Sequence, residues 1–337
     1  MNILIIKDDK PGHYNQTEGI LLALEDIYPN IVAEYVDIEI KSKISRKLLR
    51  TLLNRFPSFF KNKNSLKYIK YFYKNCNLPK NNPDIIISTG GNTANLNAWF
   101  AKVYNAKNIL NGKLRGLKEE LFTNITTVID LGYKNQIIID VAPNIITTAK
   151  LKIESEKFSQ KNNLKENYYT LLIGGDGAGY QYDDNFYEEL INFLTKTSNT
   201  NKIKWLITTS RRTPLKTEEK LRERLKKHSA YFVAYNNKAE KVLLPFLGLS
   251  KVVFVTEESS SMISEGISAK KPIYTISPKY AYPDNNYKKI LHKFLVEKKI
   301  KRINFVQLEN FKIDLNDFEI MKNDTYEDIA KKMKEYI

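Results

Sequence analysis

The first half of the chain alternates between short apolar runs and stretches whose apolar residues recur at helical spacing. Apolar runs that predict buried strands lie at 2–6, 31–40, 83–88, 126–130 and 136–143. Helical spacing falls between them, at 16–27, 44–75 and 93–103. Because these strands are continuously apolar, the pattern indicates parallel sheets that helices cover on both faces.

The same alternation restarts in the second half. It predicts strands at 168–175, 202–210, 230–235, 251–258 and 272–277, and helices at 184–196, 217–228 and 325–336. The segment 150–166 between the halves is polar and charged, and we interpret it as a linker. We therefore expect an α/β protein with two Rossmann-like, doubly wound domains that face each other across a cleft. The expected domains are residues 1–150 and 151–320, with a C-terminal helix at 321–337 that crosses back to the first domain.

Composition narrows the classes of partner. The chain has 337 residues and is 42% hydrophobic, which suits two domains that each bury a core. One cysteine and three widely separated histidines predict no disulfide and no metal site. The formal charge of +16 favours anionic partners, although an AT-rich genome would also give a chain rich in Lys, Asn and Ile. No zinc-finger, RRM or KH signature is present, so nucleic acid is not an expected partner.

The positive charge is concentrated in the stretch 41–74. It contains eleven Lys and Arg and no Asp or Glu, and Leu, Phe and Tyr residues interleave with them. This pattern predicts docking on an anionic membrane surface; two ordinary helices with solvated lysines are the alternative. No apolar run approaches the ~20 residues that span a bilayer, and no leader pattern opens the chain. We therefore expect a cytoplasmic protein. If the stretch 41–74 docks on a membrane, the protein would be peripheral on the cytoplasmic face of the inner membrane.

Three loops after predicted strands of the second half carry candidate ligand-binding residues. Glycine N–H groups in "GGDGAGYQYDD" (174–184) can approach an anion, and "TTSRRTP" (208–214) offers two forked guanidinium groups. In "TEESSSMISEGISAKKP" (256–272), serines stand at a helix start that favours phosphate, and a glutamate one turn later can accept hydrogen bonds from a ribose. Flexible turns, capped loops and solvated charges are the alternatives. Ligands of doubly wound sheets bind at such strand ends, so we predict a nucleotide site formed by Gly174, Gly175, Ser210, Arg211, Arg212, Glu258, Ser259, Ser260, Ser261 and Glu265.

Two loops after strands of the first half predict an opposite wall. They are "DDKPGHYNQ" (8–16) and "STGGNTAN" (88–95). His13 is a candidate general base because an imidazole titrates near neutral pH. Asp8 or Asp9 would orient it, and His13 with Asp9 forms our candidate catalytic pair; a hydrogen bond at a helix start is the alternative role of a lone histidine. The candidate acceptor-side residues are Gly12, Asn15, Gln16, Gly90, Gly91 and Asn92.

These motifs carry a family resemblance. The stretches "DDKPGHYNQTEGI", "LLIGGDGAG", "TTSRRTP" and "VTEESSSMISEGISAKKPIY" resemble the family of mitochondrial-fission-like proteins, in order and over nearly the whole chain. Bacterial members of that family are described as glycosyltransferases of the lipopolysaccharide outer core or capsule. The stretch "SSSMISEGISAKKP" is also similar to the donor-site helix of the peptidoglycan N-acetylglucosaminyltransferase, where a glutamate matching Glu265 binds the nucleotide ribose. Members usually carry a Gly-Arg-Arg-Thr-like run where this chain has "GGNT" (90–93).

The resemblance implies a GT-B fold and transfer of a sugar from a nucleotide-sugar donor to a glycolipid or oligosaccharide acceptor. It implies no metal ion and no cofactor beyond the donor, because GT-B enzymes generally stabilise the leaving diphosphate with arginines and helix N-termini. The sequence leaves two other functions open: a nucleotide-sugar epimerase, and a non-catalytic membrane adaptor of the fission-protein type.

Overall fold

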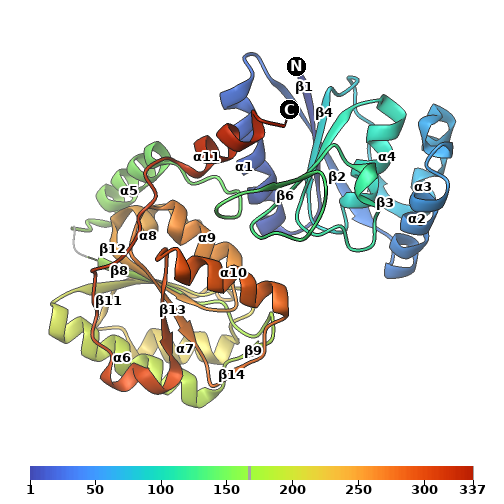
Figure 1. The fold of residues 1–337 in the computed structure, drawn as a ribbon. Coiled ribbons are helices and arrows are strands. Elements are labelled where there is room, and N and C mark those ends of the chain that lie inside the picture. Colours follow the sequence, from blue (N-terminus) through green and yellow to red (C-terminus); the bar gives the residue numbers. More distant parts are fainter. Residues whose placement is uncertain (166–167, 337) are drawn as a thin grey trace. The chain divides into compact units, whose positions relative to one another are not determined.

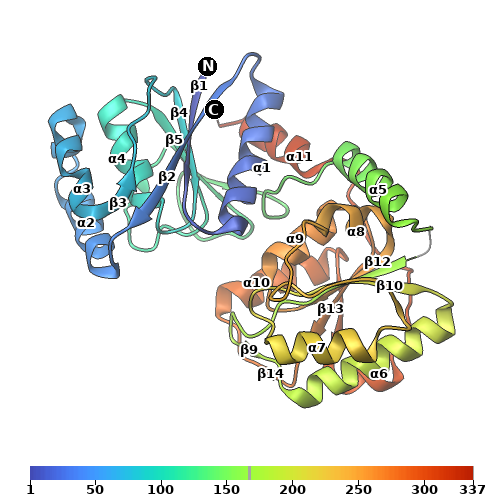
Figure 2. The same cartoon turned by 180° about the vertical axis from the view of Figure 1, so that it is seen from behind.

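The computed structural model describes residues 1–165 and 168–336, which form two compact α/β units (Figures 1 and 2). The first unit comprises Met1–Ile145 together with Thr325–Ile337, and the second comprises Ile146–Asp324. Within the described residues, no helix combines the length and apolarity that crossing a membrane requires.

The first unit is built on a seven-stranded sheet in the order β3-β2-β1-β4-β5-β6-β7. Only the edge strand β3 runs antiparallel to its neighbour; the other pairs are parallel. The order therefore reverses between β1 and β4, which is the position where doubly wound sheets bind ligands. The strands are β1 (Asn2–Lys7), β2 (Val32–Ile40), β3 (Tyr73–Cys76), β4 (Ile85–Thr89), β5 (Lys107–Asn111), β6 (Asn124–Thr127) and β7 (Gln136–Ile138).

Helices cover both faces of this sheet. The helical elements are α1 (Pro11–Ile27), α2 (Lys43–Arg55), η1 (Phe59–Lys61), η2 (Lys63–Tyr68), α3 (Ile69–Phe72), α4 (Ala94–Tyr104), η3 (Glu119–Leu121) and α11 (Thr325–Met333). Successive side chains of a strand point to opposite faces, so Ile3 and Ile5 pack in the core of α1 and α11, whereas Leu4 and Ile6 pack in the core of α2 and α4. Figure 1 shows α1 and α11 on one face, with α4 and the α2–α3 arm on the other.

The arm that follows β2 differs from the predicted single helix over 44–75. α2 ends at Arg55 because Pro57 disfavours helical backbone at the residue before it. Short 3-10 turns, α3 and the strand β3 then complete the segment. β5 was not predicted, because the run "KNILN" holds only two large apolar residues.

The second unit contains a six-stranded, fully parallel sheet in the order β11-β10-β8-β12-β13-β15. Renumbered in chain order, this is the 3-2-1-4-5-6 order of a Rossmann fold, and the order reverses between β8 and β12. A separate antiparallel pair joins β9 to β14. The strands are β8 (Tyr168–Leu172), β9 (Tyr180–Gln181), β10 (Lys204–Thr208), β11 (Ser229–Val233), β12 (Ser250–Thr256), β13 (Ile273–Ser277), β14 (Tyr280–Ala281) and β15 (Lys301–Asn304).

The helices of the second unit again lie on both faces of its sheet (Figure 2). They are α5 (Thr148–Asn162), α6 (Asp184–Asn201), α7 (Leu215–Arg224), α8 (Leu243–Leu249), α9 (Ser260–Ser268), α10 (Asn285–Val296) and η4 (Phe305–Asn310). The segment that we interpreted as a linker is instead mainly the helix α5. Thr147 caps its start, and Leu151 and Ser155 pack so closely on α8 that a Cβ at Gly248 would lie 2.7 Å from Cβ of Ser155. It looked like a linker because it buries only these two residues.

Candidate functional site

The three candidate loops of the second unit meet at the carboxyl ends of β8, β10 and β12. Gly174 follows β8, Arg212 follows β10, and Glu258 follows β12. A Cβ added to Gly174 would lie 1.5 Å from Oε1 of Glu258 and 2.7 Å from Nη2 of Arg212. The structure therefore brings these three predicted residues into direct contact, at the position where the strand order reverses.

Glu258 organises this group of residues. Its buried carboxylate accepts hydrogen bonds from Nη2 of Arg212 at 2.8 Å, from the Gly175 N–H at 3.0 Å and from the Tyr182 hydroxyl at 2.6 Å. Burial raises the pKa of Glu258 above its usual value, and the Tyr182 hydrogen bond and the Arg212 charge oppose that shift. Burial and then the neighbouring carboxylate also raise the pKa of Tyr182 well above its ordinary value. Glu258 is thus a positioning residue that fixes Arg212.

We expected the N–H groups of Gly174 and Gly175 to bind an anion, but both donate to side chains of the protein. The Gly174 N–H donates to Oγ1 of Thr256 at 2.7 Å, and the Gly175 N–H donates to Glu258. The Gly174 carbonyl accepts from the hydroxyls of Ser210 and Thr213, at 2.7 and 2.6 Å. The N–H groups of Gly174 and Gly175 are therefore bound to protein oxygens. Gly174 has no Cβ, and this leaves room for the carboxylate of Glu258.

The groups left for a ligand are guanidinium groups and a helix start. The Arg212 side chain is 31% exposed, and within the described part of the chain Nη2 is the only guanidinium nitrogen with a protein acceptor. Arg211 is exposed beside it. Ser259, the N-cap residue of α9, makes no side-chain cap hydrogen bond, so the helix start presents the N–H groups of Ser260 and Ser261 uncapped. Guanidinium groups and an uncapped helix start are both anion-binding features.

Glu265 lies one turn into α9 and is buried. Its i+4 spacing from Ser261 places both residues on one face of the helix. The predicted ribose contact of Glu265 remains a proposal.

A second buried carboxylate stands next to Glu258. Glu257 accepts from Nη2 of Arg302 at 2.5 Å, from the Tyr180 hydroxyl at 2.9 Å and from Oγ1 of Thr275 at 3.0 Å. Sequence reasoning missed Glu257 and all its partners. The alternating tyrosines of "GYQY" (179–182) could have indicated the site, since Tyr180 and Tyr182 donate to the two adjacent glutamates. No sequence pattern pointed to Arg302, on β15.

In the first unit, His13 pairs with Asp8. His13 lies in the first turn of α1, and its Nδ1 is 3.0 Å from both carboxylate oxygens of Asp8, which follows β1. Asp8 is 2% exposed and His13 is 27% exposed. Our candidate carboxylate was Asp9, but Asp9 is exposed, and the contact with His13 belongs to Asp8. With a proton on Nδ1 facing Asp8, the lone pair of Nε2 is free to accept another proton.

The glycine loop after β4 supports this pair. A Cβ at Gly90 would lie 2.3 Å from the His13 ring, so glycine is needed there for the imidazole to fit. Asn92 donates to Asp8 at 3.3 Å and accepts from Nη1 of Arg46 at 2.8 Å. A chain of polar contacts therefore runs from Arg46 through Asn92 and Asp8 to His13.

The remaining acceptor-side candidates lie close by. Gln16 accepts from Nδ2 of Asn111, at the end of β5, at 2.8 Å. Gly91 packs against the side chain of Arg115, whose Cδ would be 2.6 Å from an added Cβ. Gly12 and Asn15 lie partly exposed in the first turns of α1.

We expect the Asp8–His13 pair to give a defined pH dependence of stability. Burial alone would raise the pKa of Asp8, but the hydrogen bond and charge of His13 bring it below its usual value. A depressed carboxyl pKa stabilises the folded state above the unfolded-state pKa of about 3.9. This contribution is lost as the pH falls through the folded-state pKa.

The measurement is the urea midpoint of the native protein and of Asp8→Asn. The difference between them should be larger at pH 6 than at pH 3. An equal difference at both pH values would show that Asp8 is not stabilised in its charged form.

Residues 11–335 of the chain match the family model described as Mitochondrial fission ELM1. The chain belongs to this family. The family prediction made from the motifs is therefore confirmed. A relative in Rickettsia prowazekii, "Uncharacterized protein RP120", is 24% identical over 90% of both chains.

Solved structures similar to this ELM1-family chain show its fold. A UDP-GlcNAc 2-epimerase from Methanocaldococcus jannaschii aligns with a TM-score of 0.57 and 12% identity, covering 99% of this chain and 100% of that one. MurG from Acinetobacter baumannii aligns with a TM-score of 0.52 and 9% identity, covering 100% and 95%. The predicted fold class, GT-B-like with two Rossmann-like domains, is confirmed.

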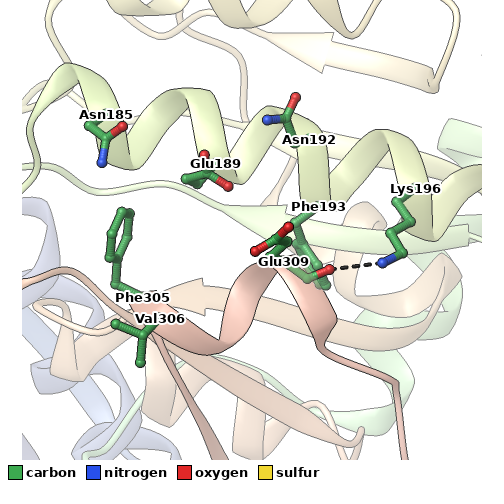
Figure 3. A pocket seen from close by; sticks show the side chains of 8 residues that line it. All are labelled: Asn185, Glu189, Asn192, Phe193, Lys196, Phe305, Val306 and Glu309. Atoms are coloured by element: carbon green, nitrogen blue, oxygen red, sulfur yellow. Dashed lines mark hydrogen bonds between the residues drawn. The ribbon is translucent and has the colours of Figure 1, made fainter.

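A separate cavity of about 430 Å³ lies between α6 and η4. Figure 3 shows its mixed lining, in which Lys196 donates to the backbone carbonyl of Glu309. None of its lining residues comes from the loops after β8, β10 or β12. The cavity is therefore distinct from the Glu258 and Arg212 group.

Proposed function

We propose that this ELM1-family chain is a metal-independent glycosyltransferase. It would move a sugar from a nucleotide-sugar donor to a cell-surface glycolipid or polysaccharide of the lipopolysaccharide core or capsule type. The observation that carries the proposal is that the partly exposed Arg212, which Glu258 holds in place, occurs together with the uncapped start of α9. Both lie where the strand order of a Rossmann sheet reverses, which is the position where such sheets bind nucleotides.

The proposed chemistry assigns one role to each unit. Arg212, Arg211 and the N–H groups at Ser260 and Ser261 bind the diphosphate of the donor and stabilise the negative charge that develops on it. Glu265 accepts hydrogen bonds from the ribose. In the first unit, Nε2 of His13 removes the proton of the acceptor hydroxyl, whose oxygen bonds to the anomeric carbon as the bond to the diphosphate breaks.

The proposal places the protein in the cytoplasm, with the basic stretch 41–74 against an anionic membrane surface. The support is uncompensated charge: Arg55, Lys61, Lys63, Lys67 and Lys70 have no ion-pair partner in the described residues, while Lys74 pairs with Glu39. Each Lys or Arg near an anionic leaflet contributes roughly 1 kcal/mol of binding.

Thermal unfolding with UDP, GDP, CMP and ADP tests the donor site. One of these nucleotides should raise the melting temperature, because a ligand that binds only the folded state stabilises it. The double variant Arg211→Ala, Arg212→Ala should lose at least ~10-fold in affinity, since hydrogen bonds to charged groups contribute about 1.5–3 kcal/mol.

The matched control removes two other exposed charges of the second unit, in Lys216→Ala, Arg222→Ala, and should bind nucleotide like the native protein. No stabilisation by any nucleotide would favour a non-catalytic adaptor over an enzyme. Incubation with donor alone, followed by sugar analysis, separates an epimerase from a transferase, because only an epimerase changes the sugar without an acceptor.

A further inference from the structure

The arm of the first unit encloses an apolar cavity of about 410 Å³. All of its lining residues are Leu, Phe, Tyr or Trp, among them Phe56, Phe59, Phe60, Tyr71, Phe72 and Trp99. Its volume falls within the ~300–1,000 Å³ typical of small-molecule sites. The site residues described above contribute nothing to it. All lining residues except Trp99 lie in the stretch 41–74, whose pattern predicted a membrane-docking surface but not a cavity.

The cavity is walled by fixed aromatic rings. The Trp99 ring meets Phe60 at 5.0 Å and Phe72 at 6.0 Å between centroids, both edge to face. Nε1 of Trp99 donates to Oγ of Ser65 at 2.9 Å, so the one polar atom of the indole is already bound. The Trp99 ring therefore presents carbon to the cavity, a surface suited to hydrocarbon.

The rim of the cavity is exposed and lies in a basic stretch of the chain. Phe56 and Phe59 are 52% and 51% exposed, and Tyr71 is 62% exposed. The guanidinium carbon of Arg55 lies 5.8 Å from the centre of the Phe56 ring. Lysines 61, 63, 67 and 70 interleave with the lining residues along the chain, and no carboxylate neutralises them in the described residues.

We propose that this cavity receives a hydrocarbon chain of an anionic, phosphate-bearing membrane lipid, whose headgroup contacts the lysines of the same stretch of chain. The inference rests on the proposed function, and it identifies how that function's membrane-bound acceptor side is held. An apolar hollow in a stretch where lysines 61, 63, 67 and 70 have no ion-pair partner in the described residues complements a lipid with an apolar tail and an anionic head. A second copy of the chain would bring the same basic stretch against it, and like charges disfavour that contact.

Trp99 gives a direct readout of an occupied cavity. The chain has two tryptophans, and Trp205 is buried in the second unit, where its Nε1 donates to Leu194. Vesicles of phosphatidylglycerol with brominated acyl chains should quench the Trp99 part of the native emission. The Trp99→Phe variant, which keeps Trp205, should bind the same vesicles without quenching.

Two further variants separate the contribution of the cavity from that of the lysines. Phe56→Ser, Phe59→Ser should lose most of the quenching, because both side chains are half exposed and their loss opens the cavity without removing core residues. Lys63→Ala, Lys67→Ala, Lys70→Ala should weaken vesicle binding by roughly 100-fold. The matched control Lys216→Ala, Lys226→Ala, Lys227→Ala has the same net charge and should bind like the native protein.

Each other outcome contradicts the proposal in a defined way. Vesicle binding without quenching would mean electrostatic docking alone. Equal quenching by brominated phosphatidylcholine, whose phosphate is balanced by a choline cation, would remove the role of the headgroup's net negative charge. Binding of an acidic amphipathic peptide but not of vesicles would assign the cavity to a protein partner. If nucleotide still stabilises the same preparation while vesicles do not bind, the lipid inference fails and the proposed transferase stands; the reverse result leaves lipid binding intact without the nucleotide site.

Discussion

Replacing Glu258 with alanine is expected to lower the free energy of unfolding by about 3–5 kcal/mol, because it leaves Arg212 and Tyr182 without their buried partner. The same change should abolish nucleotide-induced stabilisation. Within the described residues, the Arg212 guanidinium would lose its only protein acceptor and would no longer be held at the carboxyl end of β10. Urea unfolding gives the first quantity, and thermal shift with the nucleotide gives the second.

Glu257→Ala is the matched control for this variant. Glu257 is the adjacent residue, is equally buried, and pairs with Arg302 rather than Arg212. Glu257→Ala should therefore lower the free energy of unfolding by a similar amount and leave the nucleotide-induced rise in melting temperature unchanged. If both variants lose nucleotide binding to the same extent, loss of stability explains the effect and Glu258 has no specific role in positioning Arg212.

Replacing His13 with alanine is expected to lower kcat by about 100- to 10,000-fold, the usual contribution of a positioned general base. The variant should still fold, because His13 is partly exposed and Asp8 keeps its hydrogen bonds from Asn92 and the Lys10 N–H. Nucleotide stabilisation should be unchanged, since His13 belongs to the first unit. The measurement is steady-state transfer with the donor that the nucleotide screen identifies. Full activity of His13→Ala would exclude it as the base.

Asp8→Asn and Asp9→Asn resolve which carboxylate orients the histidine. Asp8 contacts Nδ1, so its loss should reduce kcat strongly, by removing the group that fixes the imidazole tautomer. Asp9→Asn should have a much smaller effect because Asp9 is exposed. A larger loss in Asp9→Asn would restore the pair that the sequence suggested.

The sequence predicted the order of strands and helices well, because continuous apolar strands leave a clear pattern. It also selected loops that meet in space: Gly174, Arg212 and Glu258 are in mutual contact because the loops after β8, β10 and β12 share one sheet edge. The sequence did not predict which of these residues bind one another and which are left for a ligand. Polar residue types alone do not reveal that Glu258 binds Arg212, or that the Gly174 N–H is taken by Thr256.

Long-range partners were the other source of error. Arg302 reaches Glu257 from a strand 45 residues further along the chain, and the arm cavity assembles side chains of α2, the 3-10 turns, α3 and α4. The Arg302 contact has no local sequence signature. The interleaved apolar residues of 41–74 predicted a surface, and not a cavity that Trp99 completes. The helix α5 was mistaken for a linker because a helix with one narrow apolar face resembles a polar connection.

The central claim is that the carboxyl end of the second unit's sheet binds a nucleotide diphosphate. Hydrogen–deuterium exchange, with and without the nucleotide that stabilises the protein, tests it most directly. We predict that the ligand slows exchange in peptides covering 174–179, 209–213 and 258–263. Protection confined to the cavity between α6 and η4, or to the first unit, would contradict the claim.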